Sequence, residues 1–142
     1  MIQMIFDILI FVWLLFLTML FFSKKQINIK KIYNKRNIKA KRYIIFYIVS
    51  ENKYFGREEI ESSIRSSVKE FLGRMWLDIS NPKLILYIDN EKRGIISTNR
   101  AGYKVILASI PGIKEINGKK ALVVPLRTTG SLKKAKKLLG IR

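Results

Sequence analysis

The run from Tyr43 to Val49 constrains the fold more than any other part of the chain, because all its residues are apolar or aromatic. A strand with one face in water would alternate apolar and polar residues instead. An unbroken short run is typical of a strand that is buried on both faces. The sheet that contains it must therefore be covered on both sides, the second side by a C-terminal helix or by a partner protein.

The residues after this strand alternate between helical and strand patterns. We expect, in order, a helix after Gly56 with the apolar stripe Ile60, Ile64, Val68, Phe71, Leu72 and Met75, strands at Leu84–Ile88 and Gly94–Ser97, a helix from Tyr103 to Ile110, a strand at Ala121–Leu126 and a last helix from Ser131 to Gly140. The order β-α-β-β-α-β predicts an α+β, ferredoxin-like or RNA-recognition-motif-like sandwich. An added basic C-terminal helix follows it, and an apolar N-terminal helix precedes it. Because the third strand offers only Ile95 and Ile96, we do not expect bases to stack on an open sheet face.

The run from Lys92 to Lys104 reads as a short strand that turns into a helix. Asn99 or Thr98 is expected to cap that helix, which leaves backbone N–H groups pointing outward beside the cations. The cations that flank this turn are Lys92, Arg93, Arg100 and Lys104. Such a turn favours a phosphate ligand, although a capped turn with solvated charges is the simpler alternative.

The charge balance indicates a polyanionic partner. The chain has 28 Lys and Arg against 10 Asp and Glu, a formal net charge of +18 over 142 residues. Self-repulsion of this size in a compact chain usually accompanies nucleic acid or an anionic membrane. The absence of cysteine and histidine excludes disulfides, thiol nucleophiles, imidazole bases and Cys- or His-ligated zinc.

The composition divides the chain into three regions: an apolar segment at 1–22, a basic arm at 23–40 and an α/β domain at 41–142. The apolar segment has the length of a membrane span and lacks the features of a typical cleavable signal peptide. As an anchor it would leave the domain in the cytoplasm, because cations follow it. Two alternatives are a real translation start downstream of Met1 and docking of the segment on a partner protein. The arm suits RNA or anionic lipid equally by charge, and a solvated linker is the other reading.

The C-terminal segment from Ser131 to Leu139 predicts a basic amphipathic helix. Its lysines, on the face opposite Leu132, Ala135, Leu138 and Leu139, are Lys133, Lys134, Lys136 and Lys137. Thr128 to Ser131 place hydroxyls at the helix start, a second site that suits an anion. A membrane surface would also suit this helix.

No catalytic constellation is visible in the sequence. Glu58, Glu59 and Glu61 lie in a predicted first helical turn, where the helix dipole favours acids. Asp78, Asp89, Glu91 and Glu115 have no metal-ligand spacing. We therefore expect neither catalytic residues nor a metal site on this chain.

Several motifs in matching order, from about Lys41 to Leu139, resemble archaeal ribonuclease P protein component 2, the Pop-five subunit family. The motifs are Lys41–Phe46 with Val49–Asn52, Gly94–Ile96 with Asn99-Arg100, Glu115–Gly118, and Thr128–Lys134. The resemblance implies a subunit of the ribonucleoprotein that removes the 5′ leader of precursor tRNA, with catalysis by RNA and its Mg²⁺ ions. It also implies pairing with the component 3 subunit, in one form as a heterotetramer.

The chain departs from the family pattern at two places. Ser97 stands where the family often has Arg, so Arg93 is a candidate replacement, and Met1 to Phe22 is expected to have no counterpart. A tRNA-processing subunit in the cytoplasm has no evident need for a membrane helix, so we rank a downstream start ahead of a true anchor.

Our interpretation is a non-catalytic RNA-binding subunit that contacts precursor tRNA indirectly. The alternative is a single-pass membrane protein whose basic cytoplasmic domain binds anionic lipids or other RNA. The residues expected to bind RNA are Lys41, Arg42, Arg93, Arg100, Lys104, Lys133, Lys134, Lys136 and Lys137.

Overall fold

The computed structural model describes residues 1–32, 35–52 and 54–141, except for the side chains of residues 24–32. Tyr33, which belongs to the expected basic arm, lies outside the described residues, and so do the side chains of Lys24, Lys25, Lys30 and Lys31. The chain divides into two compact units, Met1–Asn34 and Lys35–Arg142. The segment 23–40 is therefore shared between the two units.

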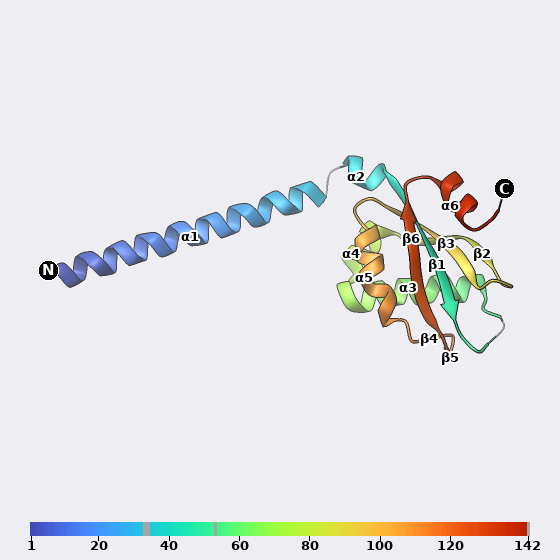
Figure 1. Ribbon diagram of the computed structural model, residues 1–142. Coiled ribbons are helices and arrows are strands. Elements are labelled where there is room, and N and C mark those ends of the chain that lie inside the picture. Colours follow the sequence, from blue (N-terminus) through green and yellow to red (C-terminus); the bar gives the residue numbers. More distant parts are fainter. Residues whose placement is uncertain (33–34, 53, 142) are drawn as a thin grey trace. The chain divides into compact units, whose positions relative to one another are not determined.

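The first unit contains one long helix, α1 (Ile2–Ile32), drawn in blue in Figure 1. The helix continues past Phe22 into the basic segment without a break. Within α1, the 22 residues Ile2–Ser23 form a stretch that is long and apolar enough to cross a membrane.

The second unit is built on a four-stranded antiparallel sheet with the strand order β2-β3-β1-β6 (Figure 1). Its elements are α2 (Lys35–Lys39), β1 (Lys41–Val49), α3 (Arg57–Leu72), α4 (Arg74–Ser80), β2 (Lys83–Ile88), β3 (Arg93–Asn99), α5 (Tyr103–Ser109), the 3-10 turn η1 (Ile110–Gly112), β4 (Glu115–Ile116), β5 (Lys119–Lys120), β6 (Leu122–Thr129) and α6 (Leu132–Leu138). Two split β-α-β units with this strand order form a ferredoxin-like α+β fold, which confirms the fold expected from the sequence.

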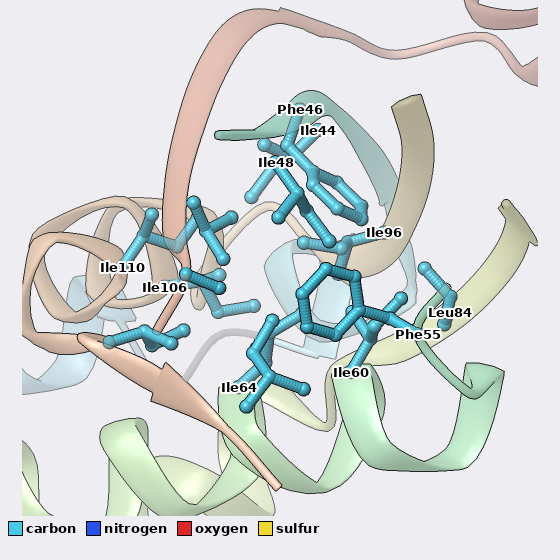
Figure 2. Close-up of a cluster of buried hydrophobic side chains, with 14 of the residues drawn as sticks. Ile44, Phe46, Ile48, Phe55, Ile60, Ile64, Leu84, Ile96, Ile106 and Ile110 are labelled. Atoms are coloured by element: carbon cyan, nitrogen blue, oxygen red, sulfur yellow. The ribbon is translucent and has the colours of Figure 1, made fainter. Parts of the chain in front are cut away.

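One face of the sheet packs against α3 and α5. Ile44, Phe46 and Ile48 on β1 meet Ile60 on α3 and Ile106 on α5 in a single buried cluster (Figure 2). These side chains alternate along β1, as expected for a strand that sends every second residue to one face. This cluster is the main hydrophobic core of the unit.

The other face of the sheet is covered by α6 beside the first half of β1, which confirms burial on both sides there, whereas Val49 at the end of the strand is 50% exposed. Tyr43 and Ile45 on β1 and Ile95 on β3 pack with Ala135 and Leu139 of the C-terminal segment. Ala135 is fully buried in this second cluster. The C-terminal helix, rather than a partner protein, therefore closes this part of the sheet.

The helix expected after Gly56 is confirmed as far as Leu72, but its apolar stripe is buried only as far as Val68. The chain breaks at Gly73, which has a φ of 87° and ends α3, and α4 then starts in a new direction. A positive φ suits glycine because glycine has no Cβ to clash. The last three residues of the expected stripe are exposed, with exposed fractions of 59% for Phe71, 39% for Leu72 and 65% for Met75.

The turn expected at Asn117-Gly118 is present and joins a short hairpin, β4 and β5. Both turn residues have positive φ, 50° and 74°, as in the tight turns that favour Asn-Gly. β6 reaches Thr129, further than the predicted strand, and its register with β1 shifts between Ile45 and Phe46. Pro125 is accommodated beside this shift because β6 is an edge strand.

Candidate nucleic-acid interface

Cations from distant parts of the sequence meet at one end of the sheet, where β1 begins and both β3 and β6 end (Figure 1). Lys41 is paired with Asn99 across β1 and β3, and the N–H of Arg100 donates to the Ala40 carbonyl at 2.7 Å. Lys41 and Arg100 are therefore neighbours although 59 positions separate them. We call this end of the unit, with the start of α5 and the helix α6, the basic end.

Arg42 connects three elements at the basic end. Its guanidinium carbon lies 6.0 Å from the centroid of the Tyr103 ring at the start of α5. A Cβ at Gly130, between β6 and α6, would lie 3.0 Å from the Arg42 Nη1 atom. A cation at this distance from an aromatic ring is attracted to the ring face, which orders the guanidinium. Gly130 leaves the room that Arg42 needs.

The helix α6 adds exposed lysines to the basic end. Lys134 and Lys137 line an open groove of about 470 Å³ together with Arg127 and Thr129 of β6. The helix presents lysines outward because Ala135 and Leu139 hold its other side against the sheet. All four predicted lysines of this helix, Lys133, Lys134, Lys136 and Lys137, are exposed.

The structure separates Arg93 from this cluster. Arg93 starts β3 and is paired with Tyr47 and Ile88, whereas Arg100 follows the far end of the same strand. Seven extended residues place the two cations roughly 20 Å apart. Arg93 instead forms an ion pair with Glu91, with 3.7 Å between the nitrogen and the oxygen. The expectation that Lys92 and Arg93 flank the same turn as Arg100 is therefore wrong.

The expected helix cap is also wrong. Asn99 and Thr98 belong to β3, and the residue that precedes α5 is Gly102. The Asn99 Oδ1 atom accepts the N–H of Gly102 at 2.7 Å, and the N–H of Arg100 is already bound to Ala40. These two N–H groups are therefore not available to an anion.

The start of α6 also differs from the expected one. Ser131 precedes the helix but makes no side-chain cap hydrogen bond. Its N–H donates to the Thr129 hydroxyl at 3.3 Å, so this threonine closes the turn between β6 and α6. Thr128 and Thr129 themselves lie in β6.

Thr98 and Asn99 fasten the basic end to the helix α4. The Thr98 hydroxyl donates to the Ser80 carbonyl at 2.7 Å, and the Asn99 side-chain amide donates to the Ile79 carbonyl. Both residues are buried, so these bonds have little competition from water. The sequence signal at these positions reflects structure rather than ligand binding.

We expect Asn99→Ala to lower the free energy of unfolding by about 2 kcal/mol, because it removes the partners of the buried Gly102 N–H and of the partly buried Ile79 carbonyl. Urea denaturation measures this change. Asn90→Ala is the matched control, since Asn90 is exposed in the turn between β2 and β3. Equal losses for the two variants would contradict the fastening role of Asn99.

Two acids of α3, Glu59 and Glu61, have structural partners. Glu59 accepts the Gly56 N–H at 3.0 Å and the Asn117 side-chain amide at 2.6 Å. Glu61 accepts the Leu84 N–H at 2.8 Å, which links α3 to β2. Among the described residues, no three acidic side chains gather into a group that could hold a metal ion.

Tyr87 on β2 has a buried hydroxyl without a hydrogen-bond partner in the described part of the chain. Burial, with the Asp89 carboxylate adding to it, raises the pKa of Tyr87 above its usual 10.0. The Tyr87 phenol therefore stays neutral at physiological pH. A group that takes up a proton in catalysis would have to be ionised, so Tyr87 does not suit that role.

Sequence reasoning missed Arg127, which is exposed and lines the groove beside α6. It directly precedes the motif Thr128–Lys134, and the pairing of β6 with β1 brings it to the basic end. The sequence analysis also assigned Lys35 and Lys39 to a separate basic arm, whereas both residues lie in α2 at the start of the second unit.

Comparison with known proteins supports the resemblance seen in the sequence. The model of the Rpp14/Pop5 family matches residues 42–139. A Saccharolobus solfataricus protein named ribonuclease P protein component 2 is 54% identical over 141 residues, which cover 99% of this chain and 98% of that protein. The protein of the same name from Sulfurisphaera tokodaii is 58% identical over 120 residues, which cover 84% of this chain and 95% of that protein.

The Saccharolobus alignment corrects one expectation. It spans nearly the whole chain, so the segment Met1 to Phe22 has a counterpart in that relative. The expectation that the family offers no counterpart is therefore wrong.

The fold has a solved neighbour as well. A chain in a cryo-EM structure of yeast ribonuclease MRP matches with a TM-score of 0.51 and 14% identity, over 72% of this chain and 87% of that one. At this identity the match concerns the fold alone. The family match and the identity to component 2 proteins lead to one conclusion: the chain belongs to the Rpp14/Pop5 family of ribonuclease P protein subunits.

Proposed function

We propose that this chain binds the catalytic RNA of ribonuclease P and supports RNA-catalysed, Mg²⁺-dependent removal of the 5′ leader from precursor tRNA. The observation that carries the proposal is the basic end, where β1, α5, β6 and α6 bring their cations together. Catalysis and the Mg²⁺ ions belong to the RNA, and the chain contributes binding.

The mechanism rests on uncompensated positive charge. Among the described residues, none of the cations Lys41, Arg42, Arg100, Lys104 and Lys134 has an ion-pair partner. Cations held close together repel one another, and phosphates relieve that repulsion while releasing the counterions of the RNA. Where two RNA segments pack closely, such a surface replaces part of the Mg²⁺ that would otherwise screen them.

Pairing with the component 3 subunit, in one form as a heterotetramer, is part of the same proposal. The exposed side chains of Phe71, Leu72 and Met75 offer an apolar surface where α3 meets α4. Exposed apolar groups in a small domain commonly mark contacts with other proteins. Co-purification of the full chain with component 3, followed by measurement of the mass of the complex, tests the pairing and its stoichiometry.

In this proposal the Lys35–Arg142 unit works in the cytoplasm, where its RNA and precursor tRNA are found.

Single substitutions test the placement of the interface. We expect Arg100→Ala to weaken binding of ribonuclease P RNA roughly five- to tenfold at moderate salt, the value of about one phosphate contact. Arg93→Ala should change the affinity less than about twofold, because Arg93 lies at the other end of β3. Filter binding across a salt series, with melting curves for both variants, measures the two effects. Equal losses of RNA affinity for the two variants would mean that Arg93 also contacts the RNA, and would contradict the separation of Arg93 from the basic end.

A further inference from the structure

The surface of α1 is a long apolar surface that no other described part of the chain covers. Its stretch Ile2–Ser23 has a mean hydropathy of 2.6, and none of it is buried. Side chains in its middle, such as Leu14 and Phe16, are 57% and 58% exposed. A contiguous apolar surface of this extent is not left in water, so another phase or molecule must cover it.

The length of the stretch matches a lipid bilayer. A helix of 22 residues rises about 33 Å, and the hydrocarbon core of a bilayer is about 30 Å thick. Burial of the helix inside a partner protein would not require the apolar stretch to have this particular length.

The apolar character runs around the whole helix. Leu14, Leu15, Phe16 and Leu17 point in four directions about 100° apart, and all four are apolar. A helix that docks in the groove of a protein presents one apolar stripe and keeps a polar face toward water. Since α1 has no polar face in this stretch, lipid on all sides accounts for it better than a groove on one side.

The polar groups of the stretch also suit hydrocarbon. Thr18 carries the one hydroxyl between Ile8 and Phe22, and it donates to the Leu15 carbonyl at 2.8 Å inside the same helix. A helix satisfies its own backbone groups, which a bilayer requires. Asp7 lies within two turns of the helix start, where a charge is close to the head groups.

The charges beyond the stretch are asymmetric. From Ser23 to Arg42 the sequence has nine cations and no acid, whereas Asp7 is the one charged side chain before it. An excess of Lys and Arg after a span holds that side in the cytoplasm. We propose that α1 spans a lipid bilayer and tethers this ribonuclease P subunit to the membrane, with the Lys35–Arg142 unit on the cytoplasmic side.

This inference goes beyond the proposed function and does not depend on it. The presence of a counterpart to the segment in the Saccharolobus relative supports a role for α1, since the segment is shared along with the domain. The basic end stays available for RNA on the cytoplasmic side.

The test uses the full chain, synthesised in a cell-free system with vesicles of uncharged phosphatidylcholine. The variant Leu14→Arg with Leu15→Arg places two charges at the centre of the span, and Leu14→Ala with Leu15→Ala is the matched control. After an alkaline carbonate wash, flotation measures the chain that remains in the vesicles. We expect the parent chain and the Ala control to float, and the Arg variant to float at least about tenfold less.

Uncharged vesicles separate insertion of α1 from attraction of the basic unit to anionic lipid, because only insertion resists the wash. RNA affinity, measured on the same proteins, should be equal in all three and reports that the Lys35–Arg142 unit is folded. Release of the parent chain by carbonate would overturn the inference, and so would equal flotation of the Arg variant. Recovery of the parent chain in a soluble complex whose partner protein shields α1 would also overturn it, and none of these results would affect the RNA-binding proposal.

Discussion

Replacing Arg100, Lys104 and Lys134 together with Ala should weaken binding of ribonuclease P RNA roughly a hundredfold or more, at a salt concentration near physiological. The three side chains are exposed and come from the end of β3, the start of α5 and α6. Each phosphate that is no longer neutralised lowers the slope of log affinity against log salt by about 0.7–0.9, so the slope should fall by about 2 to 3 in total. Filter binding over a range of salt concentrations measures both quantities.

A matched control removes the same charge elsewhere. Lys114, Lys119 and Lys120 are exposed around the hairpin of β4 and β5, at the end of the unit where β6 begins beside Val49. Their combined replacement with Ala should weaken binding less than about fivefold, through the general field of the chain alone. If the two triple variants lose the same affinity, binding follows net charge, and the basic end is not a site.

Gly102→Ala should destabilise the second unit by about 3 kcal/mol, because overpacking against rigid atoms cannot relax cheaply. A Cβ at Gly102 would lie 2.4 Å from the Ser80 Cα atom, which belongs to the backbone of α4. The substitution therefore forces α4 away from β3 and disturbs the bond between the Gly102 N–H and Asn99. Thermal or urea unfolding of the full chain measures the loss.

Gly56→Ala provides the control for this prediction. A Cβ at Gly56 meets the flexible side chain of Glu59 at 3.2 Å, and the φ of Gly56 is −66°, which alanine adopts easily. We expect a loss below about 1 kcal/mol. A small loss for Gly102→Ala, comparable to that of the control, would show that the contact between α4 and the turn after β3 is looser than described.

The fold could be predicted because its signals are local. The unbroken run at Tyr43–Val49 predicted cover on both faces of the sheet, and Ala135 and Leu139 supply it over Tyr43 and Ile45. The helix after Gly56 was predicted too long because glycine is tolerated inside helices, and only its surroundings decide its φ. In the folded chain Phe71 packs beside Gly112, where a Cβ would lie 2.1 Å from its ring, and the chain turns at Gly73.

The interface was only partly predictable because it is assembled from distant residues. Arg93 and Arg100 are seven positions apart, a spacing that looks local until the residues between them form an extended strand. Conversely, Arg42 and Tyr103 are far apart in sequence and meet through the pairing of β1 with β3. Arg127 could be assigned only once the register of β6 was known.

The central claim, that this chain supports an RNA catalyst by neutralising phosphates, is tested most directly by the Mg²⁺ requirement of precursor tRNA cleavage. Single-turnover cleavage by ribonuclease P RNA with component 3 is measured over a Mg²⁺ series, with the parent chain, the triple variant of Arg100, Lys104 and Lys134, or no added chain. The parent chain should shift the Mg²⁺ midpoint downward, the triple variant should shift it much less, and high Mg²⁺ should bring the three rates together. Substitution of Glu58, Glu59, Asp78, Asp89 or Glu91 one at a time should leave the cleavage step nearly unchanged, since none is assigned a proton transfer. A midpoint that the parent chain does not move, or a large loss of rate from one of these acids with RNA binding intact, would contradict the account.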